Sequence, residues 1–177
     1  MKLENKIAVV TGGAMGNGAG IVEVFAKYKA RVIIFDYSDK IASTIQDFRN
    51  KGYDVAGYKV DIRDARRVKL CVDDIIKRYG HIDILVNNAG VAKIVPFVEM
   101  TDEIRDFHFD INIKGTWNVT KSIVPYMQKQ KYGKIVNLSS ITGPMVADTG
   151  EVAYATTKSA LIGFTKGLAR ELVDDHI

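Results

Sequence analysis

The chain has 177 residues, of which 47% are apolar, and its 25 basic and 21 acidic residues give a formal net charge of +4. This length and composition predict one globular domain spanning residues 1–177, and the mixed signs of the charges argue against a nucleic-acid partner. No segment is apolar for long enough to cross a membrane, and we expect no leader peptide and a cytoplasmic protein.

Short β-branched segments alternate with longer amphipathic segments along the chain, which is typical of βαβ units stacked into a parallel sheet. We expect strands at residues 7–10, 31–35, 55–59, 84–87 and 134–138. Helices are expected at residues 18–29, 40–51, 65–79, 102–131 and 152–173, with Gly80 and Gly133 as C-cap glycines. This order of elements predicts a doubly wound, three-layer α/β/α fold with helices on both faces of the sheet.

A glycine-rich segment, Thr11-Gly-Gly-Ala-Met-Gly-Asn-Gly18, joins the first expected strand to the first helix. In this context Gly12, Gly16 and Gly18 allow a pyrophosphate to approach the backbone and the helix N-terminus. The alternative is a tight turn that binds no ligand. We therefore predict a dinucleotide site, and Met15 and Asn17 of the same loop are counted among its contacts.

The second expected strand is followed by Asp36, where a carboxylate can accept hydrogen bonds from the hydroxyls of an adenosine ribose. A carboxylate at that place repels a 2′-phosphate. Neither Met15 nor Tyr37, the neighbours at which a basic residue would accommodate that phosphate, is Arg or Lys, so NAD is favoured over NADP. The alternative is that Asp36 only caps the turn that follows it.

Four motifs occur in one order along the chain: the loop 11–18, Asn87-Asn88-Ala89-Gly90, Asn112 with Gly115, and Ser140 with Tyr154 and Lys158. By these motifs the chain resembles the short-chain dehydrogenase/reductases. The resemblance implies a Rossmann fold with strand order 3-2-1-4-5, and an NAD-dependent oxidoreductase that interconverts a secondary alcohol and a ketone by hydride transfer.

The resemblance also implies further cofactor contacts. Asp61 is expected to line the adenine pocket through its carboxylate, and Ile62 through its backbone. Asn88 is expected to lie against the adenosine side of the cofactor, or its amide ties neighbouring strands together, or both. Asn17 stands where the family usually carries Ile or Leu, and it either adds a polar contact or tolerates a left-handed backbone.

Tyr154 and Lys158 are four residues apart on an expected helix, so both side chains can reach a common ligand. A proton must enter or leave the substrate oxygen as hydride moves, so we expect Tyr154 to act as general acid and base. The Lys158 ammonium is expected to lower the pKa of this phenol from the ordinary tyrosine value of about 10 and to contact the cofactor together with Tyr154. Ser140 is expected to position the substrate oxygen, with Ser139 as the alternative.

Asn112 is expected, by the resemblance, to anchor a water that passes protons from Lys158 to solvent; alternatively, it is a helix-interior side chain bonded to backbone. A serine hydrolase is disfavoured because no Gly-x-Ser-x-Gly segment surrounds Ser139 or Ser140. The histidines share no motif and the single cysteine, Cys71, lies among apolar residues, so we expect a buried thiol and no metal site.

Family members continue beyond the segment that ends near Val173, so we expect a chain truncated relative to the family, with residues 134–138 exposed at a sheet edge. The alternative to an active enzyme is an inactive remnant that binds nucleotide or forms oligomers. Relatives pair subunits through the helices that correspond to residues 102–131 and 152–173, so a homodimer or homotetramer is expected under either reading.

Overall fold

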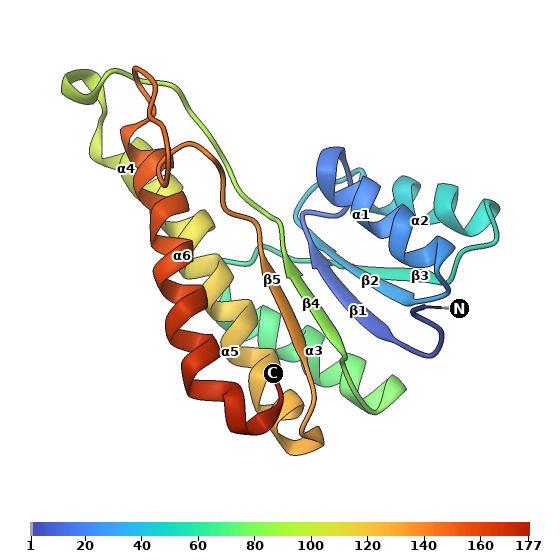
Figure 1. The fold of residues 1–177 in the computed structure, drawn as a ribbon. Helices are drawn as coiled ribbons and strands as arrows, with labels where there is room; N and C mark the ends of the chain where they lie inside the picture. Colours follow the sequence, from blue (N-terminus) through green and yellow to red (C-terminus); the bar gives the residue numbers. More distant parts are fainter. Residues whose placement is uncertain (1) are drawn as a thin grey trace.

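The computed structural model describes residues 2–177 and shows a five-stranded parallel sheet covered by helices on both faces (Figure 1). The strands are β1 (Ile7–Thr11), β2 (Arg31–Asp36), β3 (Val55–Lys59), β4 (Ile84–Asn87) and β5 (Lys134–Asn137). They lie in the order β3-β2-β1-β4-β5 with every neighbouring pair parallel, which confirms the predicted fold and strand order.

The helices are α1 (Gly16–Lys27), α2 (Ile41–Asn50), α3 (Ala65–Tyr79), α4 (Asp102–His108), a π-helical segment (Phe109–Gly115), α5 (Thr116–Gln130) and α6 (Val152–Leu172). Short 3-10 turns lie at Phe97–Glu99 and Val173–Asp175. In Figure 1, α1 and α2 cover one face of the sheet, and α3, α5 and α6 lie on the other. Within the described residues, no helix is both long and apolar enough to span a bilayer.

Central strand β1 is buried along its whole length. Ala8 and Val10 pack in the apolar cluster under α1 and α2, whereas Ile7 and Val9 pack in the cluster under α3 and α5. Successive side chains of a strand point to opposite faces, so a strand covered on both sides reads as a continuous apolar run. The second cluster also contains Cys71, which confirms that its thiol is buried.

The predicted helix 102–131 is instead divided by the π-helical segment. The register changes around Asn112, and the Thr116 hydroxyl donates a 2.9 Å hydrogen bond to the Asn112 carbonyl oxygen. A side-chain hydroxyl thus binds a carbonyl within the wider turn. Hydrophobic periodicity does not report such a change, because apolar residues continue at helical spacing on both sides of it.

Glycines end only some of the helices as expected. Gly80 follows α3 with a left-handed φ of 86°, which confirms its predicted capping role. The prediction for Gly133 is wrong, because Lys131, with φ of 54°, is the left-handed residue after α5. A glycine is required at 133 for a different reason, since an added Cβ would lie 2.5 Å from the Met127 sulfur. Packing, and not helix capping, explains this residue.

Strand β5 lies at an edge of the sheet, and Val136 in its middle is 48% exposed. The exposed edge predicted for residues 134–138 is therefore present. The chain that follows β5 runs beside the chain that follows β4, and together they rise from the sheet toward the upper end of α4 and α6 (Figure 1). This arrangement brings the loops after both strands to the same end of the molecule.

Candidate active site

A cavity of about 480 Å³ lies at the carboxyl ends of β1 to β4. Segments that follow four different strands line it, which is where doubly wound sheets bind ligands. Eight of the predicted cofactor residues are among its lining residues: Gly12, Met15, Asn17, Gly18, Asp36, Asp61, Ile62 and Asn88. The other three, Gly16, Tyr154 and Lys158, are not part of that lining.

The glycine-rich loop folds closely on itself and on the end of β4. An added Cβ at Gly18 would lie 2.0 Å from the Gly12 carbonyl oxygen and 2.6 Å from Asn88 Nδ2. Gly12 has a left-handed φ of 65°, and a Cβ there would lie 2.9 Å from the Ala89 Cα. Side chains at these positions would therefore push the loop away from β4.

Helix α1 begins directly beside the cavity. Among the residues that the structure describes, the N-cap residue Met15 makes no side-chain capping hydrogen bond, and the first turn of α1 contains no acidic residue. The first N–H groups of a helix lack intrahelical partners and carry partial positive charge. The start of α1 therefore suits an anion such as a pyrophosphate.

Asp36 is 7% exposed and borders the cavity at the end of β2. Its Oδ2 accepts a hydrogen bond from the Ala14 N–H and its Oδ1 accepts one from the Ser38 N–H, both at 2.9 Å. The hydrogen bond from Ser38 shows that Asp36 does cap the turn that follows it. Because each carboxylate oxygen has a second lone pair, these bonds leave acceptor capacity for a ligand.

Arg63 is a lining residue that the sequence reading missed. Its guanidinium donates to both oxygens of Asp61, at 2.6 Å from Nη2 to Oδ2 and 3.0 Å from Nε to Oδ1. These hydrogen bonds hold the pKa of the Asp61 carboxyl below its usual range. The spacing Asp-x-Arg in the loop after β3 is a sequence feature that could have indicated this pair.

The two asparagines after β4 tie the sheet together. Asn88 Nδ2 donates to the carbonyl oxygens of Thr11 and Gly12 at 3.0 and 3.1 Å, while Asn88 also borders the cavity. Asn87 Nδ2 donates to Thr120 Oγ1 and to Asn137 Oδ1, at 2.9 and 2.8 Å. The expectation that the Asn88 amide ties neighbouring strands together is thus confirmed, and Asn88 lies at the cavity as well. Asn87 links β4 to β5 in the same way.

Lys158 is buried beside the end of the cavity that Gly90 borders. An added Cβ at Gly90 would lie 3.2 Å from Asn112 Oδ1 and 3.4 Å from Lys158 Nζ, so these three residues converge. Lys158 Nζ donates to the Leu138 carbonyl oxygen at 2.6 Å and lies 5.7 Å from the centre of the Tyr154 ring. Burial lowers the pKa of the Lys158 ammonium.

The two serines after β5 have different partners. Ser139 Oγ donates to the Lys158 carbonyl oxygen at 2.7 Å, which ties this loop to α6. Ser140 Oγ accepts from the Thr142 N–H at 3.1 Å, so its own hydroxyl proton is not committed by that bond.

The side chain of Asn112 is almost fully buried and is held on two sides. Its Oδ1 accepts from the Val91 N–H at 2.8 Å, and its Nδ2 donates to the Val91 carbonyl oxygen and to Thr157 Oγ1, at 3.0 and 2.9 Å. The backbone-bonded alternative therefore describes this side chain. It links the π-helical segment both to α6 and to the loop after β4.

Three features together are typical of a dinucleotide-binding α/β protein. They are the doubly wound parallel sheet, the glycine-rich turn that opens α1 and the cavity at the carboxyl ends of the strands. The family model "short chain dehydrogenase" matches residues 6–177. The chain therefore belongs to the short-chain dehydrogenase/reductase family of oxidoreductases.

Among curated relatives, Oxidoreductase UcpA of Salmonella typhimurium is 48% identical over 176 residues, covering 99% of this chain and 67% of the relative. The 3-oxoacyl-[acyl-carrier-protein] reductase FabG of Thermotoga maritima is 38% identical, covering 100% of this chain and 72% of that protein.

Two similar solved structures carry different cofactors. A gluconate 5-dehydrogenase of Burkholderia cenocepacia in complex with NADP and tartrate has a TM-score of 0.93 and 28% identity, covering 99% of this chain and 69% of that one. A short chain dehydrogenase of Mycobacterium paratuberculosis bound to NAD has a TM-score of 0.92 and 29% identity, covering 99% of this chain and 70% of that one.

Proposed function

We propose that the chain forms a single NAD-binding domain and is an oxidoreductase that interconverts a secondary alcohol and a ketone. The observation that carries the proposal is the convergence of Lys158, Asn112 and Gly90 beside the cavity, with Tyr154 one helical turn from Lys158 on α6. When bound, the reduced cofactor supplies a hydride to the carbonyl carbon, and the oxidised cofactor accepts it in the reverse direction.

The residues proposed to hold the adenosine and pyrophosphate of the cofactor line the cavity, with the exception of Gly16. The start of α1 suits the pyrophosphate, with Gly12, Met15, Gly16, Asn17 and Gly18 as the surrounding loop. The carboxylate of Asp36 is proposed to bind the adenosine ribose, while Asp61, Ile62 and Asn88 border the adenine and its ribose.

NAD is proposed over NADP because of charge. Asp36 is buried at the cavity wall, and both of its oxygens accept hydrogen bonds from backbone N–H groups, so the carboxylate is fixed in place. Its negative charge repels the 2′-phosphate of NADP. The exposed neighbour Tyr37 brings no positive charge to offset it. Since similar folds bind either cofactor, this preference is the finer part of the proposal.

Proton transfer is assigned to Tyr154. In the direction of reduction, its hydroxyl donates a proton to the carbonyl oxygen, and in oxidation the phenolate takes the proton from the alcohol. The Lys158 ammonium favours the phenolate by its charge, and the lowering of the lysine pKa by burial makes it easier for this group to pass a proton on. Asn112 is proposed to lie at the start of the relay from Lys158 to solvent.

Substrate positioning is assigned to Ser140. Its neighbour Ser139 already spends its hydroxyl proton on the carbonyl oxygen of α6, whereas the Ser140 hydroxyl is free to donate to a substrate oxygen. No observation on residues 2–177 favours the inactive alternative. Within that range, no group of three or more His, Cys, Asp or Glu side chains is placed to hold a metal ion.

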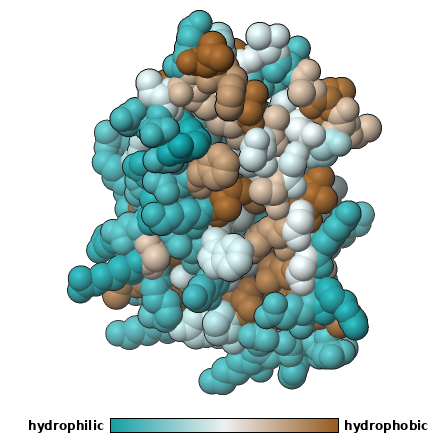
Figure 2. All heavy atoms as spheres, turned by 90° about the vertical axis from the view of Figure 1, so that its left-hand side faces the viewer, coloured by the Kyte–Doolittle hydropathy of each residue, from teal (hydrophilic) through white to brown (hydrophobic). Residues whose placement is uncertain are grey.

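A homodimer or homotetramer through residues 102–131 and 152–173 is also proposed. Trp117 on α5 packs against Phe164 on α6, with ring centres 5.2 Å apart and ring planes tilted by 41°, and yet Trp117 stays 53% exposed. Figure 2 shows the face over α4, α5 and α6, where apolar side chains form an irregular strip bordered by hydrophilic ones. Exposed aromatic side chains and apolar strips are both typical of protein interfaces.

The test is calorimetric titration of the chain with NADH and separately with NADPH, followed by assays of ketone turnover at 340 nm. Acetoacetyl coenzyme A and 5-ketogluconate are suitable probes, because the names of similar proteins specify a 3-oxoacyl group and gluconate. Selective NADH binding with turnover that Lys158→Met abolishes would support the proposal. A folded sample that binds neither nucleotide would contradict it.

A further inference from the structure

The segment 90–95, which begins with the glycine beside Lys158, is held at every second residue. The Val91 N–H donates to Asn112 Oδ1 at 2.8 Å, the Lys93 N–H donates to His108 Nε2 at 2.9 Å, and the Val95 N–H donates to the Gly150 carbonyl oxygen at 2.9 Å. Alternate N–H groups of an extended chain point to one side, so one side of this segment is bonded throughout. Its partners come from the π-helical segment, from α4 and from the loop before α6.

His108 is the middle one of these three partners, and its ring is fully buried at 0% exposure. Its Nδ1 lies 2.8 Å from the Ile104 carbonyl oxygen, and its Nε2 lies 2.9 Å from the Lys93 nitrogen. A carbonyl can only accept and an amide N–H can only donate, so Nδ1 must carry the proton and Nε2 must be bare. The two bonds therefore define a neutral imidazole in one tautomer.

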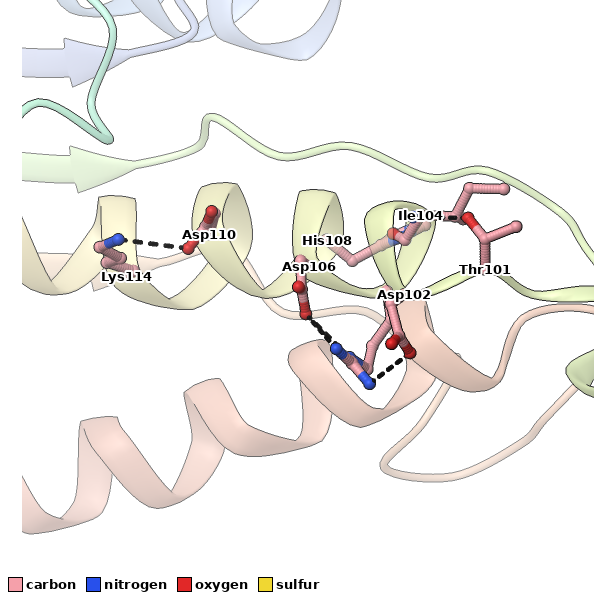
Figure 3. Close-up of polar contacts among 8 residues, drawn as sticks. Thr101, Asp102, Ile104, Asp106, His108, Asp110 and Lys114 are labelled. Atoms are coloured by element: carbon pink, nitrogen blue, oxygen red, sulfur yellow. Dashed lines mark hydrogen bonds and ion pairs between the residues drawn. The ribbon is translucent and has the colours of Figure 1, made fainter.

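Charged neighbours on α4 do not compete for this ring. Arg105 bonds Asp102 and Asp106, both at 2.8 Å, and Figure 3 shows these acids pointing toward α6, whereas His108 lies toward Ile104. The ammonium of Lys93 lies 4.6 Å from the centre of the Phe107 ring. The bond to the Lys93 backbone is thus the contact by which His108 holds the segment 90–95.

The segment itself borders the proposed site of hydride transfer. Gly90 and Val91 line the cavity, and Gly90 packs beside Lys158 Nζ. Ile94, three residues further on, is largely exposed, and its side chain lies beside Gly150 in the loop before α6. A shift of this segment would move one wall of the substrate site and leave the adenosine end of the cavity in place.

We propose that His108 is a positioning residue, which as the neutral Nδ1–H tautomer holds the segment 90–95 against α4 and so fixes one wall of the substrate site. This inference rests on the proposed function. It predicts that losing the Nε2 acceptor loosens the segment, so that substrate binding must order it again. The effect should fall on KM and not on cofactor binding.

Two variants separate the acceptor from the donor. In His108→Gln the longer amide reaches the place of Nε2 and can accept from the Lys93 N–H, whereas in His108→Asn the amide reaches only the place of Nδ1. His81→Asn, at a partly exposed histidine paired with Asp83, is the matched control. Hydrogen exchange of residues 90–95 is measured first, since it needs no turnover and therefore tests the hold on the segment independently of the proposed function.

Exchange of the Lys93 amide should become at least about tenfold faster in His108→Asn, while His108→Gln and His81→Asn stay close to the unchanged chain. With acetoacetyl coenzyme A as the probe, His108→Asn should raise KM about tenfold, equal to about 1.4 kcal/mol, with kcat and NADH affinity within about twofold. The Gln variant should restore most of this loss.

Equal protection of Lys93 in all three variants would overturn the proposal, as would lost protection with an unchanged KM. A lower kcat, a higher KM, weaker NADH binding and a lower melting temperature together would also overturn it, because the loss of a residue that only stabilises the fold has these effects. If the unchanged chain reduces no ketone, the proposed function fails, and the exchange result alone decides whether His108 holds the segment.

Discussion

The same methyl group added two residues apart in α1 should have opposite effects. In Gly18→Ala the new Cβ would lie 2.0 Å from the Gly12 carbonyl oxygen, so the loop must move, and overpacking of this kind costs about 1–3 kcal/mol. In Gly20→Ala the new Cβ would meet no heavy atom within 4 Å outside the backbone of its own helix. Replacing an exposed helical glycine with alanine raises the free energy of unfolding by about 0.5–1 kcal/mol.

Thermal unfolding and NADH titration of the two variants test this reasoning. For a chain of this size 1 kcal/mol shifts the melting temperature by about 2–4 °C. Gly20→Ala should therefore melt about 1–4 °C higher, and Gly18→Ala about 4–8 °C lower for a loss of about 2 kcal/mol. NADH affinity should fall at least about tenfold only in Gly18→Ala. If Gly18→Ala melts and binds NADH like the unchanged chain, the close packing of the loop on β4 is wrong.

Four further predictions concern single side chains. Tyr154→Phe should keep NADH affinity and lose turnover by at least about a hundredfold, and parallel loss of both in calorimetry and assay would remove its acid and base role. Asp36→Asn should weaken NADH more than NADPH, and an unchanged ratio of the two dissociation constants would contradict the charge argument. Burial raises the pKa of the Cys71 thiol. The pKa of this thiol is therefore higher in the folded state than in the unfolded state, so its contribution to stability is complete at low pH and is lost as the pH rises past the unfolded-state pKa. Raising the pH from 8 to 10 should lower the free energy of unfolding more in the unchanged chain than in Cys71→Ala. Urea titration measures this difference, and equal losses in the two chains would contradict it. Trp117→Asp should reduce the mass seen by light scattering to that of a monomer, and an unchanged mass would move the interface elsewhere than the face that carries Trp117 and Phe164.

Local patterns predicted much of the fold and part of the candidate site. The alternation of strand and helix segments gave the layers, and β3, α3 and β4 have the predicted bounds. The glycine loop was recognisable because the residues that a turn and a helix start require are neighbours in the chain. The four-residue spacing of Tyr154 and Lys158 predicted that both side chains lie on one face of a helix, and their assignment also depended on the resemblance to the family.

Other features became clear only in three dimensions. Ser139 and Ser140 are adjacent and chemically identical, and their hydrogen bonds differ because one hydroxyl meets the carbonyl oxygen of Lys158, nineteen residues further on. Asp36 both caps a turn and borders the cavity, and the guanidinium of Arg63 occupies the carboxylate of Asp61. Of these contacts, only the pair of Asp61 and Arg63, two residues apart, has a spacing in the sequence that could have indicated it.

By itself, then, the sequence determined the order of strands and helices, the glycine-rich loop before α1 and the spacing of Tyr154 and Lys158 on α6, because each depends on residues that are close together in the chain. Only the tertiary structure decided the π-helical break at Asn112, the partners of the His108 ring and the hydrogen bonds that hold residues 90–95. These depend on hydrogen bonds between segments that the fold brings together, and a buried polar group takes whatever partner that packing supplies.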